Sequence, residues 1–205
     1  MGLNKVDISN QKNRANLAIG LIDNKSRKVL ELGTGNGELF LELIKRNFDV
    51  TGTDIDIRKH LEKYKIIKHD LNKRLPFKSS TFDVVIGLEV LEHLFNPYKT
   101  MKEIRRVLRK EGVAIISMPN SASFFSRIGQ LYEKRMDNLD IYWHHHQPSI
   151  ISIRNLVATQ LKIEKEVYIM NFRRLSFLNF LSSFLLKLNR NLFAGDFMVK
   201  ARKIE

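Results

Sequence analysis

The chain of 205 residues contains no cysteine, one tryptophan and four prolines. Without cysteine it has no disulfide, thiolate metal ligand or thiol nucleophile. No stretch approaches the roughly 18 apolar residues that a membrane-spanning helix needs, and the first residues lack the apolar core of a secretory signal. Hydrophobic residues make up 43% and charged residues 28% of the chain, as in ordinary globular proteins. These features favour a single cytoplasmic domain over residues 1–205.

Positive charge exceeds negative charge, with 35 Lys and Arg against 22 Asp and Glu and a net charge of +13. The densest basic cluster has one acid, Glu103, among Lys99, Lys102, Arg105, Arg106, Arg109 and Lys110. Such a face could attract RNA or an anionic membrane surface. A solvated outer helix face, or a general basic bias, explains it more simply, and charge alone does not decide between them.

Short apolar segments alternate with helical patterns over the first 118 residues. Strands are predicted at 28–32, 48–53, 64–68, 82–88 and 113–118, and helices at 10–24, 39–45 and 97–109. This order indicates an α/β fold with a parallel sheet and right-handed crossovers.

Two longer segments interrupt the alternation beyond Pro119. Residues 120–147 exceed a simple connection and contain a predicted helix at 124–136. A helix at 149–160 and strands at 163–170 and 197–201 follow, separated by residues 171–193. We predict cap-like insertions at 120–147 and 171–193.

The second insertion contains an apolar helix at 175–188, too short to span a bilayer. Its predicted stripe consists of Phe177, Leu178, Leu181, Phe184, Leu185 and Leu188, widened by Phe180 and Leu186. A core or lid helix fits this pattern better than an interfacial membrane helix, because the segment lacks a strongly charged polar face.

A glycine-rich turn joins the first predicted strand to the following helix. It consists of Gly33, Thr34, Gly35, Asn36 and Gly37. Glycine permits positive φ angles and close approach of a ligand to the backbone, and the helix start presents free N–H groups. The dinucleotide fingerprint would need glycine where Glu38 stands, and no Gly-Lys-Ser/Thr of a phosphate loop follows.

Three carboxylates stand at the ends of three consecutive predicted strands: Glu31, Asp54 and Asp70. Ligands of open α/β sheets bind at this edge. Glu31 would repel a pyrophosphate but not a cationic amine or sulfonium, Asp54 can accept hydrogen bonds from ribose hydroxyls, and Asp70 can accept one from an adenine amine. A ligand with an adenosine and no phosphate therefore fits, whereas NAD and ATP fit poorly. Asp56 is interpreted as a helix cap.

Residues 29–120 resemble the S-adenosylmethionine (SAM)-binding core of the class I small-molecule methyltransferases, especially those grouped with the quinone and polyketide methyltransferases. The segments that carry the resemblance are VLELGTGNGELF, VTGTDID, HDLNKRLPFKSSTFDVVIGLEVLEHL and NPYKTMKEIRRVLRKEGVAIISMPN. It implies a Rossmann-like seven-stranded, mostly parallel sheet with helices on both faces, whose last strand, near 197–201, is antiparallel.

The resemblance also implies a SAM site. The glycine turn would pass under the methionyl part, Asp54 would bind the ribose, Asp70 and the Leu71 backbone would meet the adenine, and Leu88 and Glu89 would line the methionyl part. The implied cofactor-binding residues are Glu31, Gly33, Thr34, Gly35, Asn36, Gly37, Asp54, Ile55, Asp70, Leu71, Leu88 and Glu89.

Methyl transfer from a sulfonium needs mainly positioning, with a general base where the acceptor loses a proton. His93, His144 and His146 are the candidate catalytic residues, although His93 equally suits a structural hydrogen bond at a helix start. We expect Trp143, His144, His146 and the 175–188 helix to wall the acceptor pocket. No metal site is expected, because no carboxylate falls at a familiar spacing from His144 and His146.

The apolar 175–188 helix favours a small, hydrophobic methyl acceptor. An RNA or protein methyltransferase is the alternative that the positive charge suggests, although no Asn-Pro-Pro-Tyr or Asp-Pro-Pro-Tyr motif follows the fourth strand. A SAM-binding or regulatory protein without transferase activity is the alternative of another class.

Overall fold

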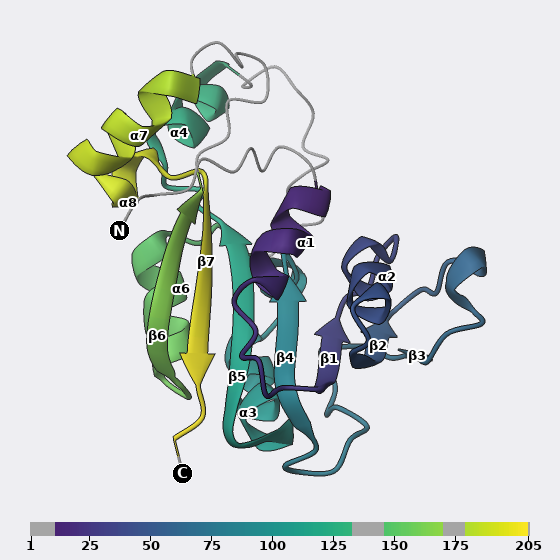
Figure 1. The fold of residues 1–205 in the computed structure, drawn as a ribbon. Coiled ribbons are helices and arrows are strands. Elements are labelled where there is room, and N and C mark those ends of the chain that lie inside the picture. Colours follow the sequence, from purple (N-terminus) through teal and green to yellow (C-terminus); the bar gives the residue numbers. More distant parts are fainter. Residues whose placement is uncertain (1–10, 133–145, 170–178, 205) are drawn as a thin grey trace.

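The computed structural model describes residues 11–132, 146–169 and 179–204. Its centre is a seven-stranded sheet in the order β3-β2-β1-β4-β5-β7-β6 (Figure 1). The strands are β1 (Lys28–Leu32), β2 (Asp49–Asp54), β3 (Ile66–Lys68), β4 (Phe82–Leu88), β5 (Leu108–Pro119), β6 (Lys162–Ile169) and β7 (Asp196–Arg202). Strands β1 to β5 pair in parallel, and β7 is antiparallel to both of its neighbours, β5 and β6. The predicted sheet with an antiparallel last strand is confirmed.

Helices cover both faces of the sheet, because the strands place alternate apolar side chains on opposite sides. On one face α1 (Gln11–Ile19) and α2 (Glu38–Lys45) pack over Val84 and Ile86 of β4. On the other face α3 (Pro97–Val107) and α6 (Ile150–Ala158) pack over Val85 and its neighbours. Two one-turn 3-10 helices complete this part, η1 (Lys59–Leu61) and η2 (Leu91–His93). Figure 1 shows α2 near the β2 end of the sheet and α6 beside β6.

Strand β5 begins earlier than the sequence predicts, and α3 ends earlier. The helix stops at Val107 and the strand starts at Leu108, which is fully buried and pairs with Phe82. A register shift follows between Phe82 and Val84. The three charged residues after Leu108 are exposed, so their polarity resembles a helix end although their backbone extends the strand.

The second insertion differs from its predicted pattern. Helix α7 (Asn179–Leu188) ends as expected, and α8 (Arg190–Phe193), which was not predicted, follows it. Phe184 and Leu188 are 63% and 67% exposed, whereas Leu186 is only 8% exposed and joins the core. Of the predicted apolar stripe, Phe184 and Leu188 thus lie outside the core, whereas Leu186, which was expected only to widen the stripe, belongs to the core. Residues 170–178 lie outside the described part.

Hydrogen bonds of Asn120 connect the two insertions at the end of the sheet. Its side-chain amide donates to the carbonyls of Asn191 at 3.0 Å and Ala194 at 2.7 Å, and its backbone N–H donates to Gly195 at 2.7 Å. These bonds join the end of β5 to the segment that leads into β7. Helix α4 (Phe124–Tyr132) follows directly and packs against α8. The helices α4, α7 and α8 consequently stand together at the carboxyl end of β5 (Figure 1).

Candidate active site

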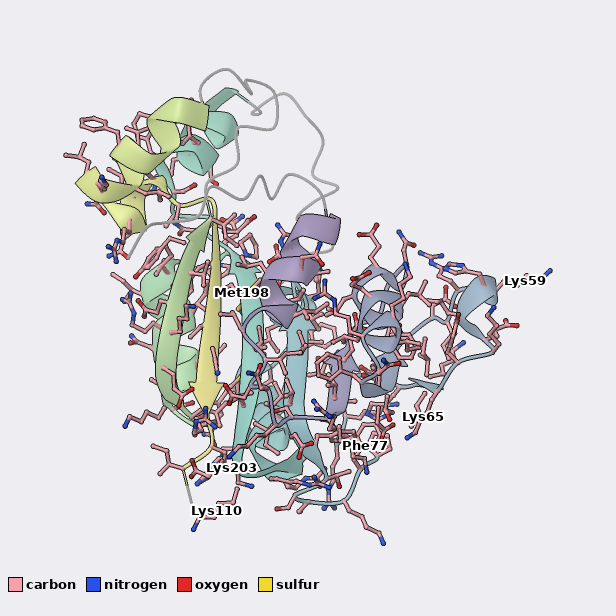
Figure 2. The ribbon with its side chains drawn as sticks, viewed as in Figure 1. Lys59, Lys65, Phe77, Lys110, Met198 and Lys203 are labelled. Carbon is pink, nitrogen blue, oxygen red and sulfur yellow. The ribbon has the colours of Figure 1, made fainter. Side chains whose placement is uncertain are left out.

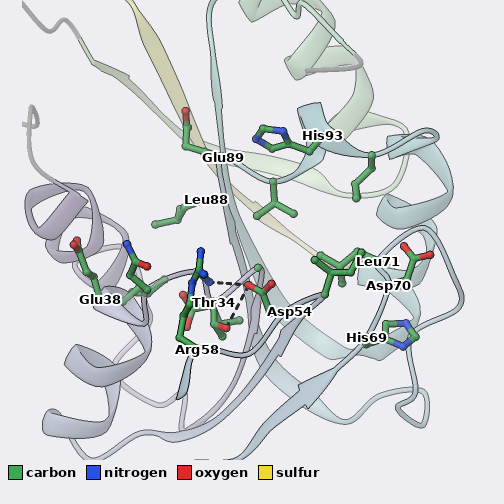
Figure 3. Close-up of a pocket in the computed structure, with 18 of the residues that line it drawn as sticks. Thr34, Glu38, Asp54, Arg58, His69, Asp70, Leu71, Leu88, Glu89 and His93 are labelled. Atoms are coloured by element: carbon green, nitrogen blue, oxygen red, sulfur yellow. Dashed lines mark hydrogen bonds between the residues drawn. The ribbon is translucent and has the colours of Figure 1, made fainter. Parts of the chain in front are cut away.

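A cavity of about 690 Å³ opens where β1, β2 and β4 end. Most residues of the predicted cofactor set line it: Glu31, Gly33, Thr34, Gly35, Asn36, Asp54, Ile55, Asp70, Leu71, Leu88 and Glu89. His93 lines it as well. In Figure 3, Asp54 lies between the glycine turn and Asp70, while Glu89 and His93 lie together at another end of the cavity. Parallel strands therefore bring separate sequence motifs to one site.

The three turn glycines have different roles. Gly33, Gly35 and Gly37 have φ values of 70°, 50° and 81°, a region that disfavours other residues. A Cβ on Gly33 would lie 2.6 Å from Val90, and one on Gly37 would lie 2.6 Å from Leu61, whereas one on Gly35 would meet nothing within 4 Å. Gly35 thus leaves its space to the cavity. Gly37 is the N-cap of α2 and is not a cavity-lining residue.

The carboxylate of Asp54 ties the end of β2 to the glycine turn. Its Oδ2 accepts from the Gly35 N–H at 2.7 Å and from the Thr34 hydroxyl at 3.5 Å (Figure 3). Its Oδ1 accepts from the Asp56 N–H at 3.1 Å. The interpretation of Asp56 as a helix cap is wrong. Arg58 occupies the N-cap of η1 without a side-chain cap bond, and the Asp56 carboxylate instead lies 3.8 Å from Arg58.

Glu31 presents a buried carboxyl at the floor of this site. The residue is 4% exposed, and its Oε2 has no hydrogen-bond partner among the described residues. Burial, with a further contribution from the negative charge of Asp54, raises the pKa of Glu31 well above its ordinary value. Because an unpaired buried carboxyl is unfavourable, this position suits a ligand that brings a cationic or hydrogen-bond-donating group.

Asp70 is held in a tight local turn at the other side of the cavity. Its Oδ1 accepts from the backbone N–H of Asn72 at 2.9 Å and from the Asn72 side-chain amide at 3.1 Å. The backbone hydrogen bond is the main reason that the pKa of Asp70 is lowered. The neighbouring Leu71 is buried, so this segment combines an ionised carboxylate with an apolar wall.

The end of the cavity near His93 contains charges that no sequence motif predicts. Arg14 of α1 lines the cavity, donates to Asp196 at 2.6 Å and lies 3.9 Å from Glu89. Burial opposes its charge, but Glu89 and Asp196 outweigh that effect and raise the pKa of Arg14. Glu89 has a positive φ of 55° and accepts from the Ser117 hydroxyl at 2.7 Å. Only the fold brings Arg14 here, so no local sequence signal identifies it.

Glu92 in η2 was also missed. It is 1% exposed, and its Oε2 has no hydrogen-bond partner among residues 11–132, 146–169 and 179–204. Burial, followed by repulsion from Glu89, raises the pKa of Glu92 to about 8. The alternation Glu-Val-Leu-Glu-His at a predicted helix start is typical of solvated residues, so burial of Glu92 was not apparent.

The three candidate catalytic histidines have different outcomes. His93 lines the cavity and has an exposed side chain. His146 donates its backbone N–H to the Glu92 carbonyl at 3.2 Å, and its buried Nε2 has no partner in the described part of the chain. His144 and Trp143 lie outside the described residues. The structure thus brings the backbone of His146 against Glu92 of η2.

Comparison with known proteins agrees with this geometry. A family model described as a methyltransferase domain matches residues 8–159. A protein named probable S-adenosylmethionine-dependent methyltransferase from Mycolicibacterium smegmatis is 34% identical over 107 residues, which are 48% of this chain and 40% of that protein. A ubiquinone biosynthesis O-methyltransferase from Histophilus somni is 28% identical over 108 residues, 46% of this chain and 45% of that protein. The matched region thus spans less than half of these relatives.

A solved structure extends the likeness to the whole fold. The SAM-dependent methyltransferase from Archaeoglobus fulgidus aligns with a TM-score of 0.72 at 22% identity, covering 94% of this chain and 93% of that one. The family match covers most of the sheet and every strand-end motif described above. The chain belongs to the methyltransferase domain family and has the fold of the class I SAM-dependent methyltransferases.

Proposed function

We propose that the protein transfers the methyl group of SAM to a small, hydrophobic acceptor. The unpaired buried oxygen of Glu31 is the observation that carries the cofactor assignment. It lines a cavity that also contains the glycine turn and two strand-end carboxylates, and no Lys or Arg of a phosphate site replaces them in that turn. This donor set suits a ligand with a cationic amine and a sulfonium, and disfavours a phosphate.

In this proposal, different residues of the cavity bind different parts of the cofactor. Glu31 and the turn around Gly35 would hold the methionyl part, Asp54 the ribose hydroxyls, and Asp70 with Leu71 the adenine. Bound SAM supplies an electrophilic methyl group on its sulfonium. The Asp54 carboxylate is already oriented by its bonds to the turn, so little reorganisation is needed on binding.

The chain contributes positioning and a proton acceptor. Direct displacement needs an acceptor atom aligned behind the methyl group, and positioning supplies much of the acceleration. His93 is the lining histidine at the end of the cavity near Glu89, which makes it our candidate base. His144 and His146 remain candidates for the acceptor side. Glu92 is a buried residue of η2 and does not line the cavity, so we assign it a positioning role.

A small acceptor is favoured over RNA by the position of the positive charge. The predicted basic cluster begins on α3 and continues to Lys110 at the start of β5. Lys110 and Lys203 lie at the end of the molecule opposite to α7 (Figure 2), away from the strand ends that form the cavity. Arg106 pairs with Glu103 at 2.6 Å and Arg109 pairs with Asp83 at 2.6 Å, which neutralises part of the cluster.

Titration calorimetry with SAM and with its demethylated product tests the cofactor assignment. We expect both to bind the purified protein, and Glu31→Gln to weaken SAM at least tenfold, since hydrogen bonds to charged groups contribute about 1.5–3 kcal/mol. Glu38→Gln, at an exposed lining residue, is the matched control. Absence of SAM binding refutes the proposal. A methyl-transfer screen with radiolabelled SAM against extracted lipids, polar metabolites and RNA then tests the acceptor, and exclusive labelling of RNA refutes the small-acceptor part.

A further inference from the structure

Helices α4 and α7, which both pack against α8, expose large apolar side chains. On α7, Phe184 and Leu188 are 63% and 67% exposed, and their spacing of four residues places them on one helix face. On α4, Phe124 and Phe125 are each 41% exposed. Their ring centroids lie 5.9 and 6.3 Å from that of Phe193 on α8. The three phenylalanines thus form an aromatic cluster across α4 and α8, and α7, which carries Phe184 and Leu188, packs against α8. We call these five residues the apical surface.

The helices that carry the apical surface bear exposed positive charges and no acidic residue. The exposed cations are Arg127 on α4, Lys187 on α7 and Arg190 on α8. The Arg190 guanidinium also lies 5.4 Å from the ring centroid of Tyr168 and interacts with the carboxylate of Glu166 on β6. In the sequence, no aspartate or glutamate occurs between Glu111 and Glu133, or between Glu166 and Asp196. The charged face that α7 lacks by itself is therefore supplied by its neighbours.

This combination selects one kind of occupant. Apolar side chains beside Lys and Arg are the features by which a surface helix binds the headgroup and upper acyl region of an anionic bilayer. A symmetric contact with a second copy would bring like charges together, which disfavours self-association through this surface. No helix within the described residues is long and apolar enough to span a membrane, so docking would be peripheral.

We propose that the apical surface docks the protein on an anionic lipid membrane, with Phe184 and Leu188 inserted and Lys187, Arg190 and Arg127 at the lipid phosphates. The Asn120 hydrogen bonds fix this surface to the carboxyl end of β5, and the cavity opens at the same edge of the parallel strands. Docking would therefore leave the cavity close to the lipid surface.

Vesicle flotation with the full chain tests this proposal. The probes are vesicles of phosphatidylcholine alone and vesicles with a third of phosphatidylglycerol. We expect binding at least tenfold tighter to the anionic vesicles, weakening as salt rises. Lys187→Gln with Arg190→Gln should weaken it about 25-fold, since each cation near an anionic membrane contributes roughly a fivefold factor. Phe184→Ser with Leu188→Ser should weaken it at least tenfold.

Two matched controls separate this surface from general stickiness. Ile151→Ser removes an apolar side chain that is 56% exposed on α6, and Lys99→Gln with Lys102→Gln removes two exposed cations on α3. Both should leave vesicle binding within twofold of the unmodified protein.

Several results would overturn the docking proposal. The first is failure of the unmodified protein to float with anionic vesicles. The second is an equal loss of vesicle binding in the α3 control variant and in the Lys187→Gln, Arg190→Gln variant. The third is a dimer, detected by light scattering, that the Phe184→Ser, Leu188→Ser variant no longer forms. Binding of the apical cations to RNA without vesicle binding would also overturn it. Circular dichroism and SAM titration on each variant verify its fold. Because vesicle binding does not require methyl transfer, the docking proposal can fail without the proposed function failing, and the reverse.

Discussion

Replacing Glu92 with glutamine should change how the stability of the protein depends on pH. In the folded state, burial and the charge of Glu89 keep the pKa of Glu92 at about 8, against 4.5 for an ordinary glutamate. Arg14 lowers the pKa and Asp196 raises it, but both contribute less. The folded protein therefore retains the Glu92 proton at a pH where the unfolded chain has released it.

The sign and size of the effect follow from this difference. Between pH 4.5 and 8 the folded state binds the extra proton, so this group lowers the free energy of unfolding progressively as pH rises. Each pH unit inside that window costs about 1.4 kcal/mol. From pH 5 to pH 7.5 the loss is about 3 kcal/mol. Glu92→Gln removes the titration but keeps the shape of the side chain. The free energy of unfolding of this variant, relative to that of the unmodified protein, should therefore rise by about 3 kcal/mol from pH 5 to pH 7.5.

Urea unfolding, followed by circular dichroism at pH 5 and pH 7.5, measures how the difference in stability between Glu92→Gln and the unmodified protein changes with pH. The exposed Glu62 provides a matched control, since Glu62→Gln should shift stability equally at both pH values. A difference between Glu92→Gln and the unmodified protein that stays constant across the two pH values would refute the reasoning. It would mean that Glu92 is ionised and compensated in the folded protein.

Three further substitutions test the architecture around the site by thermal or urea unfolding. Gly37→Ala should lower the free energy of unfolding by about 1–2 kcal/mol, because Gly37 has a φ of 81°. Gly20→Ala, at a position without positive φ, is the control and should lower it less. An equal loss of stability in the two variants would contradict the backbone argument. Asn120→Ala should cost about 2–3 kcal/mol, since two backbone carbonyls before β7 lose their donor, whereas a loss under about 0.5 kcal/mol would show that water replaces the amide. Arg14→Gln should cost about 3 kcal/mol, because it leaves the carboxylate of Asp196 without the guanidinium 2.6 Å away; an unchanged urea midpoint would show that this ion pair does not stabilise the fold.

Much of the sheet and of the cavity could be predicted because the signals are local. Apolar runs predict β1 and β4, and the glycine turn indicates a close approach of a ligand to the backbone. Since parallel strands end at one edge, Glu31, Asp54 and Asp70 were expected in one place, and all three line the cavity. Family membership supports SAM as the cofactor.

The parts that could not be predicted depend on contacts between distant segments. Burial of Glu92 and the arrival of Arg14 follow from packing of α1 and η2 at the cavity, not from neighbouring residues. Leu186 joins the core although the apolar stripe of α7 places it at the margin, and the four residues of α8 carry no periodic pattern. The early start of β5 at Leu108 is hidden by the charged residues that follow it.

The place of β7 between β5 and β6 has a consequence for how the protein folds as it is synthesised. Strand β6 leaves the ribosome before β7, yet in the sheet it pairs only with β7. Until Asp196–Arg202 emerges, β5 has an open edge and β6 has no partner. Completion of the sheet is thus a late, long-range event, and nascent chains would expose strand edges that chaperones and proteases recognise.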